Sequence, residues 1–144
     1  MNLAEALLKA DVDKITHKET KDFEVKRLSE AMGVPFILHL AEIPPKRVAE
    51  IQSLSFEMDR KGRIKKGDTY TMNMLYLCDG ITNPEFGDKN VLKRFGVATK
   101  KELLGKILNS GEISDIAGEI LKLCGYDPDE EDNTESDAVD TVKN

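Results

Sequence analysis

Apolar residues recur every three or four positions through most of this 144-residue chain, which is typical of amphipathic helices. Two stripes are especially regular: Val48, Ile51, Leu54 and Met58, and then Ile113, Ile116, Ala117, Ile120 and Cys124. With the weaker stripes included, the spacing predicts five or six short helices. They span about residues 2–10, 44–61, 69–79, 89–95, 100–108 and 111–124.

Two segments, 22–28 and 35–43, instead combine strand-favouring residues with partial alternation. The residues between them include Gly33, which suits a turn, so we expect an antiparallel hairpin. Because two strands alone are marginally stable in water, the hairpin must pack against helices. The predicted fold is therefore α+β and predominantly helical, with five or six short helices packed with one β-hairpin near the N-terminus.

Polar residues and glycines mark the helix ends most clearly in the second half of the chain. Thr99 followed by Glu102 is a capping-box pattern, in which each side chain satisfies a backbone N–H at the other's position. Asp88 is placed to cap the start of the helix over residues 89–95, and Gly96 to end that helix. Gly125 follows the last stripe, where a left-handed backbone conformation is common.

The length favours a single domain. Residues 127–144 carry eight Asp or Glu against one Lys, so the other 126 residues carry 20 basic and 19 acidic groups. We therefore predict one compact domain over residues 1–127 and a disordered acidic tail over 128–144. A nearly neutral body also argues against strong nucleic-acid binding.

Candidate metal ligands are few. His17 and His39 lie 22 positions apart, and neither has a second ligand at metal-binding spacing. Cys78 and Cys124 both fall within apolar helical patterns, which favours buried, reduced thiols over a disulfide. We expect no metal site.

No pattern of residues points to catalysis. The acidic run 127–138 resembles a calcium loop, but Asp132 stands where glycine is needed and Ala138 where a bidentate glutamate is needed. Nucleotide-binding glycine motifs and nucleophile elbows are missing. We therefore expect no enzyme activity and no cofactor.

The chain also shows no signal peptide and no apolar run long enough to span a membrane. It is expected to be cytoplasmic.

The segment 60–66 has five basic residues in seven positions. It is either a solvated connection between helices or a patch for an acidic partner, including the protein's own acidic tail. The sequence leaves both interpretations open.

The segment 69–79 is apolar nearly all round, which indicates either a helix at the centre of the core or one partly covered by another chain. In the second case we expect Met72 and Tyr76, one turn apart, to contact the partner. The side chains expected to face the core are then Tyr70, Met74, Leu77 and Cys78.

From Pro84 onward, an ordered set of short motifs resembles the C-terminal half of the XkdN-like phage tail assembly chaperones. The motifs are Pro84, Phe95-Gly96-Val97, Glu102-Leu103-Leu104, Gly111-Glu112 and Gly125-Tyr126-Asp127. The general layout upstream also fits, so the resemblance covers about residues 20–127.

The resemblance implies a role as a non-catalytic holdase. Such chaperones keep the tape measure protein soluble until tail tube subunits polymerise around it. The implied partners are therefore the phage tape measure protein and the tail tube protein, with self-association as a further contact. The implied location is the bacterial host cytoplasm, and the mature virion is expected to lack the protein.

Two alternatives stay open at this stage. One is a small structural tail protein, such as an adaptor or tube-associated subunit. The other is a phage regulatory protein that binds nucleic acid through the basic segment 60–66.

Overall fold

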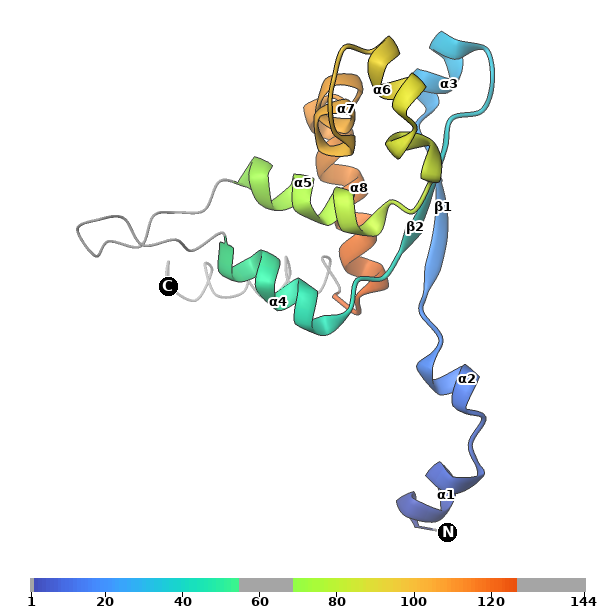
Figure 1. Ribbon diagram of the computed structural model, residues 1–144. Helices are drawn as coiled ribbons and strands as arrows, with labels where there is room; N and C mark the ends of the chain where they lie inside the picture. Colours follow the sequence, from blue (N-terminus) through green and yellow to red (C-terminus); the bar gives the residue numbers. More distant parts are fainter. Residues whose placement is uncertain (1, 55–68, 127–144) are drawn as a thin grey trace, which may run out of the picture.

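The computed structural model describes residues 2–54 and 69–126. In chain order its elements are α1 (Leu3–Lys9), α2 (Val12–Thr16), β1 (Thr20–Glu24), α3 (Lys26–Met32), β2 (Ile37–Ala41), α4 (Pro45–Leu54), α5 (Thr69–Gly80), the 3-10 helix η1 (Pro84–Gly87), α6 (Lys89–Arg94), α7 (Lys100–Ile107) and α8 (Ser110–Leu123). Figure 1 shows a compact body, from which α1 and α2 project as an arm. The described residues confirm the predicted α+β, predominantly helical fold with an antiparallel strand pair near the N-terminus.

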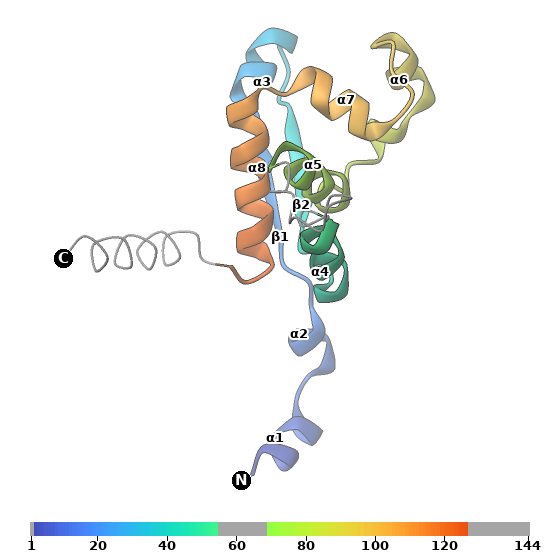
Figure 2. The same cartoon turned by 90° about the vertical axis from the view of Figure 1, so that its left-hand side faces the viewer.

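Helix α5 lies at the centre of the body. It packs against α4 and α7, and α8 crosses it and continues alongside both strands (Figure 2). Ten of the side chains buried between these elements are no more than 1 % exposed: Leu38, Leu40, Ile51, Met74, Tyr76, Leu77, Leu103, Leu104, Ile116 and Ile120. The core is therefore mainly aliphatic, as a chain without Trp and with few aromatic residues requires.

The strand pair is antiparallel, with Thr20 opposite Ala41 and Glu24 opposite Ile37. The chain that leaves α5 joins the free edge of β2. There the Asn83 side chain accepts a hydrogen bond from the His39 N–H at 2.7 Å and donates one to the Ile37 carbonyl at 3.0 Å. Asn83 is only 8 % exposed, so these bonds compensate for burying a polar amide.

The connection between the strands contains a helix, which the predicted hairpin did not include. Residues 26–28, predicted as strand, belong to α3, and Gly33 ends that helix with φ of 74°. The Ser29 hydroxyl closes the connection, because it accepts a hydrogen bond from the Phe36 N–H and donates one to the Glu24 carboxylate. No side chain caps the start of α3, so the sequence carried no start signal for it.

The caps in the second half are close to the prediction but not identical. The Thr99 hydroxyl accepts from the Glu102 N–H at 3.1 Å, as expected. Glu102 accepts from the Ala98 N–H instead of the Thr99 N–H, so the reciprocal half of that capping box is wrong. The complete box belongs to the last helix, where Asn109 and Glu112 exchange two hydrogen bonds of 2.9 Å.

Gly80 sets the closest approach of α5 to α8. A Cβ at this position would lie 2.6–2.9 Å from three side-chain carbons of Ile120, which is closer than carbon atoms pack. Glycine therefore lets the two central helices of the body touch.

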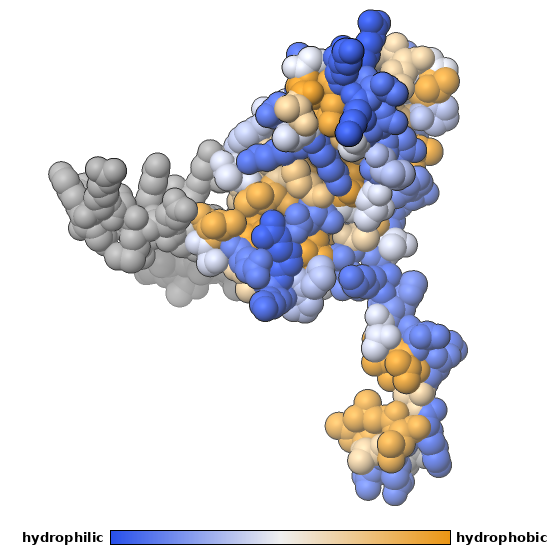
Figure 3. Space-filling model, in the orientation of Figure 1, coloured by the Kyte–Doolittle hydropathy of each residue, from blue (hydrophilic) through white to orange (hydrophobic). Residues whose placement is uncertain are grey.

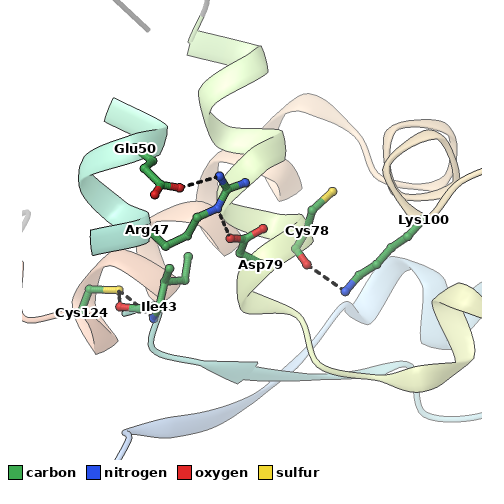
Figure 4. A network of polar contacts seen from close by, with 7 residues as sticks. All are labelled: Ile43, Arg47, Glu50, Cys78, Asp79, Lys100 and Cys124. Atoms are coloured by element: carbon green, nitrogen blue, oxygen red, sulfur yellow. Dashed lines mark hydrogen bonds and ion pairs between the residues drawn. The ribbon is translucent and has the colours of Figure 1, made fainter. Parts of the chain in front are cut away.

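Polar side chains fix α5 from two further sides (Figure 4). Arg47 of α4 pairs with Asp79 and, at 3.3 Å, with Glu50. From α7, the Lys100 ammonium donates to the carbonyls of Cys78, at 2.9 Å, and Ile81. It thereby satisfies carbonyls at the end of α5, although burial lowers the pKa of Lys100.

Candidate partner-binding surfaces

The structure places the two predicted partner-binding residues, Met72 and Tyr76, differently from each other. Tyr76 is 1 % exposed and belongs to the core, so the prediction that its side chain faces outward is wrong. The reason is that Tyr76 lies beside Gln52 of α4 and beside Cys124 and Tyr126, which follow α8, so it has no free face. Burial raises the pKa of the Tyr76 phenol, and a hydrogen bond with Gln52 offsets part of this rise.

Met72 is half-buried and packs against the edge of the core. Its predicted contact with a partner stays a prediction. Tyr70, expected to face the core, is instead 51 % exposed, and its hydroxyl lies 2.8 Å from where a Cβ on Gly105 would stand. The assignment of the two tyrosines is therefore reversed, whereas Met74 and Leu77 are fully buried as predicted.

The residues considered for chemistry do not converge on one site. His17 is exposed on the arm, and His39 faces the opposing strand, where its Nδ1 lies 2.7 Å from an oxygen of Asp22. Cys78 and Cys124 are both free thiols and half-buried rather than fully buried. Within the described ranges, no three His, Cys, Asp or Glu side chains are grouped so that they could hold a metal ion.

The arm (residues 2–19) carries the most exposed apolar side chains in the described part of the chain. Leu3, Leu7, Leu8, Val12 and Ile15 are all between 57 % and 87 % exposed. Figure 3 shows them gathered on the arm, apart from the body. Neither α1 nor α2 has a buried residue.

Both arm helices are nevertheless capped at their start. The Asn2 side chain accepts a hydrogen bond from the Glu5 N–H at 2.8 Å, and Asp11 accepts one from the Asp13 N–H at 3.0 Å. The prediction of a helix over 2–10 is confirmed, but α2 was missed. Its only sequence signals were Asp11 and the spacing of Val12 and Ile15, which five residues repeat too few times to recognise.

A second exposed apolar surface lies at the corner between α3 and β2, at the end of the body opposite the arm (Figure 1). We call it the α3–β2 corner; its residues are Met32, Val34 and Ile37, which are 57 %, 53 % and 40 % exposed. The neighbouring Phe36 points inward and packs on Phe86, with 5.8 Å between ring centroids. The corner is therefore held by the core beneath it.

A pocket of about 210 Å³ lies between α4 and the end of α8. Its lining residues are Glu42, Ile43, Pro45, Val48, Ala49, Gln52, Cys124, Gly125 and Tyr126. The Cys124 sulfur accepts a hydrogen bond from the Ile43 N–H at 3.3 Å (Figure 4), and Gln52 donates to the Tyr126 hydroxyl at 3.2 Å. These two bonds tie Ile43, just before α4, and Gln52 of α4 to the residues that follow α8.

A comparison with known families decides the identity. The family model described as phage XkdN-like tail assembly chaperone protein matches residues 4–139. The chain belongs to this family. No curated protein and no solved structure shows a significant match.

The match includes the arm from residue 4 onward, the whole described body and most of the acidic segment. The XkdN-like resemblance recognised from the motifs of the second half is thereby confirmed and extended beyond residues 20–127. No helix in the part of the chain that the structure describes is long and apolar enough to cross a membrane. The basic segment 60–66 and the acidic tail predicted over 128–144 lie outside the described residues.

Proposed function

We propose that this tail assembly chaperone acts as a non-catalytic holdase in the bacterial host cytoplasm. It binds the phage tape measure protein and releases it to the polymerising tail tube. The observation that carries the proposal is the family match over residues 4–139. The grouping of apolar side chains on the surface supports it.

A tape measure protein offers long helices with apolar stripes, and an apolar surface with adaptable side chains suits such a partner. The α3–β2 corner has these properties, since Met32 is flexible and all three of its side chains are exposed. The corner rests on the well-packed core, so it can bind a client without unfolding. We place the client contact there, in preference to Tyr76, which the core encloses.

Co-expression with the cognate tape measure protein tests the function. We expect the tape measure protein to remain in the supernatant with the wild-type chain and to precipitate without it. If it precipitates equally in both cases, the holdase function is wrong.

A paired set of variants then tests the location of the surface. Met32→Asp with Val34→Asp should abolish the solubilising effect, because charge is incompatible with an apolar contact. Leu54→Asp with Phe95→Asp, which places the same charges at side chains 50 % and 43 % exposed and outside both the corner and the arm, is the matched control and should retain the effect. Circular dichroism should show both double variants folded. A folded corner variant that still solubilises the client places the client surface elsewhere.

Mass spectrometry of purified phage particles separates the chaperone from a structural tail protein. We expect the chain to be absent from particles, because a holdase leaves when the tube has formed. A copy number comparable to that of other tail components would identify it as an adaptor or tube-associated subunit instead.

A further inference from the structure

The two helices of the arm are short and capped, although neither has a buried residue. Helix α1 has seven residues and α2 has five, and isolated helices shorter than about 12–15 residues are marginal in water. Both are capped, and together they present five large apolar side chains to solvent. A short capped helix with an exposed apolar side gains its stability when that side packs against another surface.

The pocket between α4 and α8 has the size and lining to receive such side chains. At about 210 Å³ it is smaller than the roughly 300–1,000 Å³ of sites that enclose a small-molecule ligand. Ile43, Pro45, Val48 and Ala49 give it an apolar wall, and Glu42 and Gln52 add polar groups to the lining. It therefore suits one or two aliphatic side chains, with a polar or basic group beside them.

Arm and pocket also meet at one residue. The arm joins the body at Glu19, whose N–H donates to the Glu42 carboxylate at 2.7 Å. Glu42 in turn lines the pocket. The arm thus leaves the body at the edge of the pocket, and its own α1 points away from the body (Figure 1).

We propose that α1 of one copy docks in the α4–α8 pocket of a second copy, and that the two copies exchange their arms reciprocally. Leu7 and its apolar neighbours on the same side of α1 enter the pocket. Reciprocal exchange forms a closed two-fold dimer, in which each arm fills one pocket and none is left over. The proposal concerns self-association and does not depend on the tape measure protein.

The native thiol in the pocket permits a direct test by disulfide formation between two distinguishable chains. The first chain carries Leu7→Cys, Cys78→Ala and Cys124→Ala, and the second carries only Cys78→Ala and a tag that changes its mass. Under mild oxidation we expect a disulfide-linked heterodimer that a reductant separates. Glu5→Cys in place of Leu7→Cys is the control, because it lies on the opposite side of α1 and should cross-link much less. Equal yields from the two positions, or no heterodimer, would overturn the proposal.

A single chain with Leu7→Cys, Cys78→Ala and native Cys124 distinguishes exchange from folding back. Exchange gives a covalent dimer. A monomer with an internal disulfide would show that the arm fills its own pocket, which contradicts the proposal.

Sedimentation across a range of concentrations measures the same contact without cross-linking. Ala49 is exposed and lines the pocket, so Ala49→Arg should obstruct it and weaken dimerisation at least about tenfold, equivalent to about 1.4 kcal/mol. Leu7→Ser should weaken it similarly from the other side of the contact. Ala31→Arg, at an exposed position on α3, is the matched control and should dimerise as the wild type does. A wild type that is monomeric throughout, or an Ala49→Arg dimer as tight as the wild type, would overturn the proposal. So would a monomeric Ala49→Arg variant whose Leu7→Ser counterpart dimerises normally.

Discussion

The core around α5 and the arm at residues 2–19 both carry apolar side chains on helices, but these side chains are buried in the core and exposed in the arm. In the core, Met74, Leu77 and Ile120 are fully buried because α4, α7 and α8 converge on one central helix. In the arm, Leu3 and Leu8 are 75 % and 87 % exposed although they too belong to a helix with an apolar side. The body therefore has a complete core of its own, whereas the arm has apolar residues without a covering surface.

This difference teaches that helical periodicity shows which face of a helix is apolar but not what covers it. Substitutions in the core should change the free energy of unfolding, and equivalent substitutions in the arm should change only association. The predictions below compare the two regions, from the largest expected effect to the smallest.

The largest contrast is between two substitutions by aspartate. Tyr76→Asp removes a buried aromatic ring, which alone typically costs about 3–5 kcal/mol, and adds an unpaired charge in the core. We expect loss of cooperative unfolding in thermal and urea denaturation. Leu7→Asp, at a side chain 57 % exposed, should leave the unfolding midpoint of the monomer within experimental error of the wild type. A folded Tyr76→Asp variant would show that Tyr76 is a surface residue after all.

Two glycines in the helices of the body should respond in opposite directions to alanine. At Gly80 the new methyl group meets Ile120, and overpacking of this kind costs about 1–3 kcal/mol. At Gly118, within α8, nothing lies within 4 Å of the added carbon. Gly118→Ala should therefore stabilise the protein by about 0.5–1 kcal/mol, because alanine favours a helix. Chemical denaturation of both variants measures the difference, and equal effects would contradict the close approach of α5 and α8.

Removal of a helix cap should also affect the free energy of unfolding differently in the body and in the arm, by a smaller amount. Thr99→Ala removes the cap of α7 and should lower the free energy of unfolding by about 0.5–2 kcal/mol. Asn2→Ala removes the cap of α1 and should leave global unfolding unchanged, since α1 has no buried residue. Urea denaturation at low protein concentration measures both. A comparable loss from Asn2→Ala would mean that the arm is part of the cooperative core.

The smallest effect concerns ion pairs between α8 and the β1–α3 side of the body. A hydrogen bond from Arg27 lowers the pKa of Glu112, and one from Lys21 lowers that of Glu119, both below the usual 4.5. The stability that the two carboxylates contribute is therefore present above 4.5 and is lost as the pH falls through their lowered pKa values. The melting temperature should fall over this acidic range in the wild type. In Glu112→Gln with Glu119→Gln the decline should be shallower, and an identical decline would show that other groups cause it.

The sequence was sufficient to predict the helices that are long enough for an apolar residue to recur several times on one face. It indicated α4, α5, α7 and α8, as well as two glycines that end helices, Gly96 and Gly125, both of which have a positive φ. It did not indicate α3, because no side chain caps its start and Val25 before it favours a strand.

The orientation of α5 was the main error, and it has a physical cause. A helix that is apolar on every side gives no indication of which residues its neighbours cover. Tyr76 is buried because α4 and the residues that follow α8 lie against its side of α5. The pocket likewise depends on residues 42–52 and 124–126 meeting in space, which no local pattern encodes.

Hydrogen exchange followed by mass spectrometry, on the full chain at low and high concentration, tests most directly the division between a complete core and an arm that lacks a covering surface. We predict slow exchange in α5 and α8 at both concentrations. Amides in α1 should exchange rapidly in dilute solution and become protected only in concentrated solution, where a second copy covers them. Protection of α1 that is already as strong as that of α8 in dilute solution would contradict this division, and so would rapid exchange throughout α5.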